Sequence, residues 1–204
     1  SKIVAEYDVP PGEWYFAGNR QGDMPFAVLL EIALQPCGWL AGYIGSALTS
    51  DVDLSFRNLG GKAEQFFPIY PNAGTLSIKV HITRASSSGG MIIQHYEYEV
   101  HSRRGLAYQG NTYFGFFSKQ ALAQQVGIRE AKLYGPTTDE LSRAKKFSYP
   151  ETGLFPGTRM RMIDRVETFV PDGGPEGLGY IRGTKDVNPN EWFFKAHFFQ
   201  DPVC

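Results

Sequence analysis

Cysteine is scarce in this chain, which has only Cys37 and Cys204 among its 204 residues. Two cysteines do not make the disulfide framework of a small secreted domain, and no C-x-x-C or Cys/His pattern points to a zinc site. A surplus of charge is also absent, because 20 basic residues are balanced by 21 acidic ones and the formal net charge is −1. Nucleic-acid binding, which needs a basic face, therefore has no support.

Targeting signals are missing as well, since the first residues have no signal-peptide character. Together with the low cysteine content, this predicts a reducing, cytoplasmic compartment. One apolar run, residues 26–48, is long enough to be mistaken for a membrane span, but Glu31, Gln35 and Pro36 lie inside it. We therefore predict that it is a buried core helix and that the chain has no membrane span.

What the chain does contain is an internal repeat. Residues 8–23 read DVPPGEWYFAGNRQGD and residues 186–201 read DVNPNEWFFKAHFFQD, offset by 178 positions without a gap. Seven positions are identical, and the pair Trp14 and Trp192 anchors the match. The repeat predicts that the chain holds one structural unit followed by the start of a second.

The two copies differ at one chemically important position. Where the second copy has His197, the first has Asn19. Imidazole titrates near neutral pH, whereas an amide does not titrate. The second copy is therefore predicted to be capable of proton transfer, and the first is predicted to be a degenerate pseudo-site at Asn19.

Turn signals divide the first part of the chain into a long helix and a series of strand-like runs. The helix is predicted from Pro25 to about Leu48, and a short second helix at 118–126. Strands are predicted at 3–9, 52–59, 64–70, 75–84, 91–101 and 106–117. Turn signals such as Gly60-Gly61 separate them. The pattern predicts an α+β fold, in which the helix lies on one face of an antiparallel sheet.

These patterns predict a first unit at residues 1–126, a polar linker at 127–153, and the start of a second unit at 154–204. The second unit opens with strands at 160–170 and 179–187, followed by the repeated tryptophan loop. By the logic of the repeat, a long helix should come next. We therefore expect these 204 residues to be part of a longer polypeptide.

His197 is the first candidate for chemistry. Four phenylalanines surround it in EWFFKAHFFQDPVC, so partial desolvation is expected to favour the neutral, base-competent imidazole. The alternative is a buried structural histidine. His81, His95 and His101 lie in strand-like runs without matching partners and are expected to be surface or cross-strand residues.

Glu31 is the second candidate, because a carboxylate inside an apolar helix is costly unless it is paired or protonated. Gln35 follows four residues later, on the same face, and could hold the carboxyl group in one orientation. A desolvated glutamic acid is a good proton donor. The alternative is an ordinary carboxylate near the positive end of the helix dipole.

Structural roles are predicted for several other residues. The three glycines of the long helix leave a bare strip, which we interpret as a packing feature where strands approach closely. Cys37 is expected in the core, and Trp14 and Trp192 are expected to anchor packing. The glycines are Gly38, Gly42 and Gly45.

Several of these segments together resemble the beta-hydroxyacyl-acyl-carrier-protein dehydratases, and more narrowly their dehydratase/isomerase branch. The resemblance lies in residues 160–166 (MRMIDRV), in Gly179-Tyr180, and in DVNPNEWFFKAHFFQDPV. Residues 24–31 (MPFAVLLE), with Gln35, match a later part of the same family pattern. The paired arrangement is similar to the dehydratase domains of polyunsaturated fatty acid synthases.

The resemblance implies a hot-dog fold, in which a curved antiparallel sheet wraps around a central helix, present here as a tandem (double) hot dog. His197 falls on the family's catalytic histidine and Glu31 on its catalytic acid, while Phe26 replaces an expected glycine. The family's site lies between paired units, so His197 would meet Glu31. The reciprocal site, with Asn19, would be inactive.

The implied activity is dehydration of a 3-hydroxyacyl thioester to a trans-2-enoyl thioester, with His197 as base and Glu31 as acid. No metal or redox cofactor is required, and the substrate would arrive on the phosphopantetheine of an acyl carrier protein. Other domains of a multidomain synthase are expected partners, and a homodimer is compatible with the fold. The alternatives are a hot-dog thioesterase and a non-catalytic acyl-binding domain, and double-bond isomerisation is an additional activity of the branch.

Overall fold

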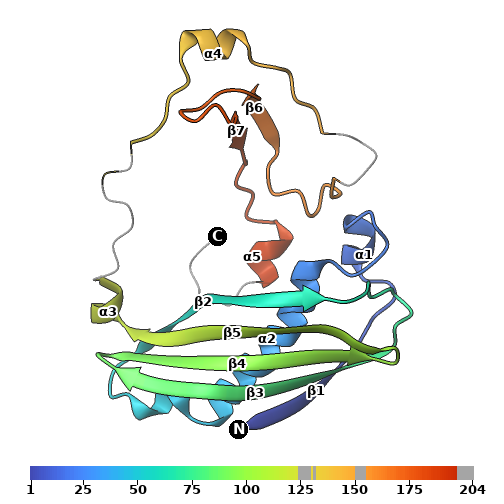
Figure 1. The fold of residues 1–204 in the computed structure, drawn as a ribbon, viewed down its shortest axis with the longest axis vertical. Helices are drawn as coiled ribbons and strands as arrows, with labels where there is room; N and C mark the ends of the chain where they lie inside the picture. Colours follow the sequence, from blue (N-terminus) through green and yellow to red (C-terminus); the bar gives the residue numbers. More distant parts are fainter. Residues whose placement is uncertain (124–129, 131, 150–154, 197–204) are drawn as a thin grey trace. The chain divides into compact units, whose positions relative to one another are not determined.

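The computed structural model describes all residues except 124–129, 131, 150–154 and 197–204. The chain divides into two compact units, Ser1–Ala131 and Lys132–Cys204. The first unit contains an antiparallel sheet and a long helix, and the described part of the second contains a hairpin and short helices (Figure 1).

The sheet of the first unit has five antiparallel strands in the order β1-β3-β4-β5-β2. In chain order, they are β1 Lys2–Asp8, β2 Leu54–Gln65, β3 Thr75–Ser88, β4 Met91–Ser102 and β5 Gly105–Ser118. The two faces differ because side chains alternate along each strand. On β3, Leu76, Ile78 and Val80 are buried, whereas Lys79 and His81 are exposed.

Helix α2, Phe26–Tyr43, covers the apolar face of this sheet and contacts β1, β3 and β4 (Figure 1). Its buried residues recur at helical spacing, as one apolar face requires: Leu29, Ala33, Pro36, Cys37, Leu40 and Ala41. A long helix on one face of a curved antiparallel sheet is the hot-dog arrangement. The predicted α+β class and the core position of Cys37 are confirmed.

One helical stretch, Phe26–Thr49, is long and apolar enough by length and composition to cross a membrane. Its buried side belongs to the same hydrophobic cluster as the inward residues of the strands. This packing supports the core-helix interpretation. The α-helical part ends earlier than predicted, because Gly45 adopts a left-handed backbone with φ 74° and a short 3-10 turn, η1 Ser46–Thr49, follows.

The prediction of two strands around Gly60-Gly61 is wrong, because β2 runs through both glycines. The pairing of β2 with β5 shifts between Asn58 and Gly60, which marks a bulge rather than a turn. A Cβ atom on Gly61 would lie 2.3 Å from the carbonyl oxygen of Asn111. The glycine is therefore needed for close approach of the two strands. The short helix α3, Lys119–Ala123, follows β5.

The internal repeat is also a repeat of structure. Helix α1, Trp14–Gly18, and helix α5, Trp192–Ala196, begin at the two matched tryptophans and have equal lengths of 5 residues. The strand before each helix also begins at a matched position, because β1 starts at Lys2 and β7, Tyr180–Thr184, starts at Tyr180. Each copy is therefore a strand followed by a short helix, in the same frame.

In the described residues of the second unit, β7 pairs with β6, Arg165–Val170, in a two-stranded antiparallel sheet. Both strands are shorter than the predicted runs of 160–170 and 179–187. The long helix that would complete a second hot-dog unit is not among the described residues. The tandem architecture and the predicted domain limits therefore stay predictions.

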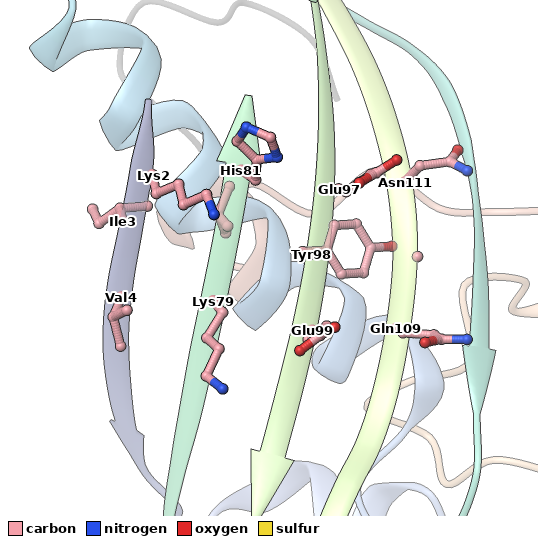
Figure 2. A pocket seen from close by; sticks show the side chains of 12 residues that line it. Lys2, Ile3, Val4, Lys79, His81, Glu97, Tyr98, Glu99, Gln109 and Asn111 are labelled. Carbon is pink, nitrogen blue, oxygen red and sulfur yellow. The ribbon is translucent and has the colours of Figure 1, made fainter. Parts of the chain in front are cut away.

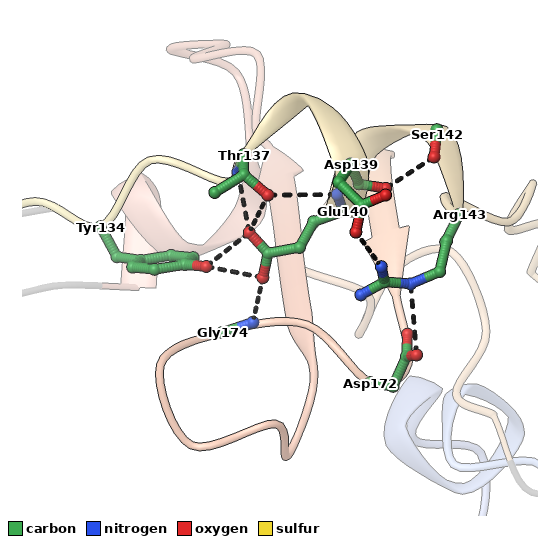
Figure 3. A network of polar contacts seen from close by, with 8 residues as sticks. All are labelled: Tyr134, Thr137, Asp139, Glu140, Ser142, Arg143, Asp172 and Gly174. Atoms are coloured by element: carbon green, nitrogen blue, oxygen red, sulfur yellow. Dashed lines mark hydrogen bonds and ion pairs between the residues drawn. The ribbon is translucent and has the colours of Figure 1, made fainter.

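The segment predicted as a polar linker contains ordered structure. Helix α4, Thr138–Ser142, begins with a capping box in which Thr137 and Glu140 bond reciprocally to each other's backbone N–H groups. Glu140 is 8% exposed, and its carboxylate also accepts hydrogen bonds from the Tyr134 hydroxyl at 2.6 Å and from the Gly174 N–H at 2.8 Å (Figure 3). Glu140 thus fastens α4 to the turn between β6 and β7.

Candidate active site

Glu31 and Gln35 lie on the exposed side of α2, away from the sheet. Their spacing of four residues places both on one helical face. The Gln35 side-chain amide donates a short hydrogen bond to Oε1 of Glu31. The contact expected from the sequence is present, and it fixes the orientation of the Glu31 carboxyl group.

The expectation that Glu31 is desolvated is wrong for the structure as described, since its side chain is exposed. Each residue of an α-helix advances by about 100°, so Glu31 lies roughly 200° around the helix from the buried Leu29. Leu29 and Ala33 lie on the opposite, core-facing side and are buried, whereas Leu30 and Ile32 are half-buried.

The exposed stripe that carries Glu31 continues into an apolar groove. This groove has a volume of about 310 Å³ and is lined by Gly38, Gly42, Gly45, Ala47, Leu48, Phe56 and Phe116. Apart from the neighbouring residues of α2 itself, no atom lies within 4 Å of a Cβ atom built on Gly38 or Gly42. The interpretation of these two glycines as close-packing positions is therefore wrong, because nothing in the described residues approaches them.

Asn19, the predicted pseudo-site residue, lies at the C-terminal end of α1. Its side-chain amide donates to Oδ1 of Asp23 at 3.0 Å. The helix itself is anchored in the core by the buried Tyr15 and Phe16. Burial and a 3.2 Å hydrogen bond to the Tyr7 hydroxyl raise the pKa of Tyr15 well above its usual range. Helix α1 therefore holds Asn19 in a firm local framework.

His197 lies outside the described residues, which end at Ala196, the last residue of α5. The side chain of Trp192, at the start of α5, donates from Nε1 to the carbonyl oxygen of Arg159 at 2.9 Å. This hydrogen bond supports the predicted anchoring role of Trp192. The predicted meeting of His197 with Glu31 stays a prediction.

A cluster of charged side chains lies beside the residues that precede α5. Lys185 binds Asp164 at 3.1 Å and Glu191 at 2.9 Å, and the hydrogen bonds to Glu191 and Asp164 raise the pKa of Lys185. The pKa of Asp164 is lowered, first by the backbone N–H of Asp186 and then by Lys185. The sequence did not reveal this cluster, because its members are separated along the chain.

The other three histidines lie in β3 and β4, as predicted. His101 contacts Glu99 at 2.8 Å, and His95 stacks on Tyr113 with ring centroids 5.3 Å apart. His81 lines an open hollow of about 550 Å³ on the face of the sheet opposite α2 (Figure 2). Figure 2 shows α2 behind the sheet, so this hollow is separate from Glu31.

In the described part of the chain, no three His, Cys, Asp or Glu side chains are grouped so that they could hold a metal ion.

The sequence contained a signal for the ordered structure at residues 137–142. Thr137 followed three residues later by Glu140 is the pattern of a capping box.

The family of FabA-like domains matches residues 1–109 and 155–204 of this chain. The chain belongs to the FabA-like domain family.

A curated relative supports the same placement. The chain is 30% identical over 224 aligned residues to a subunit of the polyunsaturated fatty acid synthase from Thraustochytrium sp. (strain ATCC 26185 / S-3). The match covers 98% of this chain and 15% of the relative, so the chain spans a small part of that protein's length.

Two solved structures show a likeness in fold. One is the dehydratase heterocomplex ApeI:P from Xenorhabdus doucetiae, with a TM-score of 0.47 and 16% identity, covering 60% of this chain and 80% of that one. The other is a probable thioesterase from Bartonella henselae, with a TM-score of 0.43 and 15% identity, covering 59% of this chain and 93% of that one. At these values, neither structure is an argument for one reaction over another.

Proposed function

We propose that the chain is a dehydratase that converts a 3-hydroxyacyl thioester into a trans-2-enoyl thioester. Membership of the FabA-like family supports a dehydratase in general. The observation that carries the specific proposal is the Glu31 carboxyl group, oriented by Gln35 on the same stripe of α2 as an apolar groove. A reactive group beside an apolar channel suits a substrate with a polar head and an alkyl tail.

In the proposed reaction, His197 removes a proton from the carbon next to the thioester, which the thioester carbonyl makes acidic. The bond between the third carbon and its hydroxyl oxygen breaks, and a double bond forms between the second and third carbons. Glu31 gives a proton to the departing hydroxyl, which leaves as water. Proton exchange with solvent then resets both side chains, with no metal or redox cofactor in the reaction.

The acyl tail is proposed to lie along the exposed stripe of α2 toward Gly38 and Gly42. With a rise of 1.5 Å per residue, these glycines lie roughly 10 Å and 16 Å along the helix from Glu31. The distance suits a chain that starts at the reacting carbons and runs into the groove. Because the groove is apolar, burying methylene groups in it is favourable, at about 0.8 kcal/mol each.

The substrate is proposed to arrive on the phosphopantetheine arm of an acyl carrier protein, and other domains of a multidomain synthase are proposed partners. The support is the relative named as a synthase subunit, of which this chain matches 15%. Isomerisation of the new double bond is a finer proposal, since the same base could move a proton between the second and fourth carbons.

The deciding experiment compares the complete polypeptide with its His197→Ala variant, using a 3-hydroxyacyl thioester on an acyl carrier protein. Mass spectrometry of the carrier should show loss of one water in the wild type. The variant should be slower by more than roughly 100-fold, because a general base contributes at least that much. Release of the free acid would instead indicate a thioesterase, and binding without turnover would indicate an acyl-binding domain. Undiminished dehydration by the variant would refute the role of His197.

A further inference from the structure

The start of α5 is held by one lysine. Lys185, directly after β7, binds Oε1 of Glu191, the residue that precedes α5, at 2.9 Å. The same ammonium group binds Oδ1 of Asp164, just before β6, at 3.1 Å. The other oxygen of Asp164 accepts the backbone N–H of Asp186 at 2.7 Å. Lys185 therefore ties the beginning of the helix to both strands of the hairpin.

The cluster is partly shielded from solvent, with side-chain exposures of 28% for Lys185, 29% for Glu191 and 33% for Asp164. A pair at this depth is screened less than a fully exposed one. Without Lys185, two carboxylates that now share a cation would face each other with no charge between them. Like charges at short range repel, so the start of α5 should move away from the hairpin.

The first copy of the repeat forms its helix without a lysine at this position. Tyr7 occupies the position that matches Lys185, and its hydroxyl lies 3.2 Å from that of Tyr15. Glu13 matches Glu191, but position 7 offers it a phenol in place of an ammonium group. Helix α1 nevertheless begins and ends at the same matched positions as α5. The lysine is therefore not required for this strand-helix unit to form, and it occurs in the copy that carries the histidine.

We propose that Lys185 is a positioning residue, which fixes the direction of α5 and thereby supports the proposed role of His197. This inference rests on the proposed function, because its catalytic effect requires His197 to act as the base. The helix ends at Ala196, one residue before His197. We expect a change in the direction of α5 to lower kcat, because His197 follows the helix directly in the sequence.

The test compares Lys185→Met, Lys185→Arg and the matched control Lys146→Met, which alters an exposed lysine of the same unit. In the complete polypeptide, Lys185→Met should lower kcat by roughly 10- to 100-fold, as expected for a slightly displaced catalytic group. KM should change little, because the groove and Glu31 belong to the first unit. Lys185→Arg should recover most of kcat, since it restores the charge, and Lys146→Met should behave as the wild type.

A second measurement separates this inference from the proposed function. The indole N–H signal of Trp192 in an NMR spectrum reports on the start of α5, whatever the reaction is. It should shift in Lys185→Met and stay in place in Lys146→Met. If His197→Ala abolishes dehydration but Lys185→Met leaves the signal or kcat unchanged, the role of Lys185 is overturned and the dehydratase stands. If Lys185→Met shifts the Trp192 signal but His197→Ala keeps full dehydration activity, the proposed mechanism is overturned. The catalytic role of Lys185 is then overturned with it.

Discussion

The side-chain amide of Asn19 donates a hydrogen bond to the carboxylate of Asp23, with 3.0 Å between Nδ2 and Oδ1. Both residues belong to the internal repeat, in which His197 and Asp201 occupy the matched positions. The predicted pseudo-site residue Asn19 thus makes a polar contact at the sequence position where the second copy has a histidine. A carboxylate beside that position is suited to hold a histidine as well as an amide.

Replacing Asn19 with histidine should place an imidazole beside Asp23. The negative charge should raise the pKa of the new histidine above about 6.5, the value of an unperturbed imidazole. Its stabilising effect should then be present at low pH and be lost as the pH rises through the raised pKa. An NMR titration measures the shift, and Asp23→Asn in the same background should remove it. A histidine that titrates alike in both backgrounds would contradict the contact.

Removing the amide of Gln35 should affect chemistry rather than folding. Gln35→Leu deletes the hydrogen bond to Glu31 at an exposed position, so kcat should fall by about 10-fold while the melting temperature changes little. The double variant Glu31→Gln/Gln35→Leu should be no slower than Glu31→Gln alone, because the two side chains act as one unit. Additive losses would show that Gln35 has a separate role.

Two glycines should respond to alanine in opposite ways. Gly38→Ala introduces a methyl group into open space within a helix, and should raise the free energy of unfolding by up to about 1 kcal/mol. Gly61→Ala would bring a methyl group within 2.3 Å of the Asn111 carbonyl oxygen and should lower it. Urea denaturation of both variants measures the difference. A destabilised Gly38→Ala protein would indicate that another part of the molecule covers this glycine.

Filling the apolar groove should change which acyl chains are accepted. Gly42→Leu places a branched side chain where a Cβ atom has no neighbour within 4 Å, so the first unit should still fold. KM should rise for long 3-hydroxyacyl substrates and remain similar for short ones. Kinetics with a series of chain lengths test this, with Gly38→Ala as a milder companion. An equal rise in KM for all chain lengths would argue against the groove as the binding site of the acyl tail.

Glu140 should make the stability of the second unit dependent on pH in the acidic range. Hydrogen bonds from Tyr134, and then from the backbone of Thr137 and Gly174, lower the pKa of Glu140 to about 2. A lowered pKa means that the stabilisation is complete above the unfolded value of 4.5 and is lost as the pH falls toward 2. Wild type and Glu140→Gln should therefore differ in urea denaturation at pH 7 and converge in acid. A constant difference would assign the effect to packing instead.

Much of the first unit was predictable from local patterns. Strand-like runs separated by turn signals predicted the positions of β3 and β4, and the apolar run at residues 26–48 predicted a core helix. The pair Gly60-Gly61 was misread, because a glycine pair is a common turn signal and the close approach of Asn111 comes from a distant strand.

The contact between Glu31 and Gln35 was predictable, but the surroundings of the two side chains were not. Glu31 and Gln35 were found from their spacing, yet the exposure of Glu31 depends on which side of α2 meets the sheet. The contacts of Glu140 and Lys185 join residues 34 and 21 positions apart, to Gly174 and Asp164 respectively. Such contacts arise from tertiary folding and leave no periodic trace in the sequence.

The strand and helix of the first copy, β1 and α1, start at the same repeat positions as β7 and α5 in the second copy, and this has an evolutionary consequence. Because Tyr15 and Phe16 pack α1 into the core, the residue after it could change from a titratable group to an amide without loss of the scaffold. A duplicated segment of this kind allows one copy to lose its titratable side chain while the other copy keeps it. A copy that lost its titratable group in this way would keep the role of a structural support.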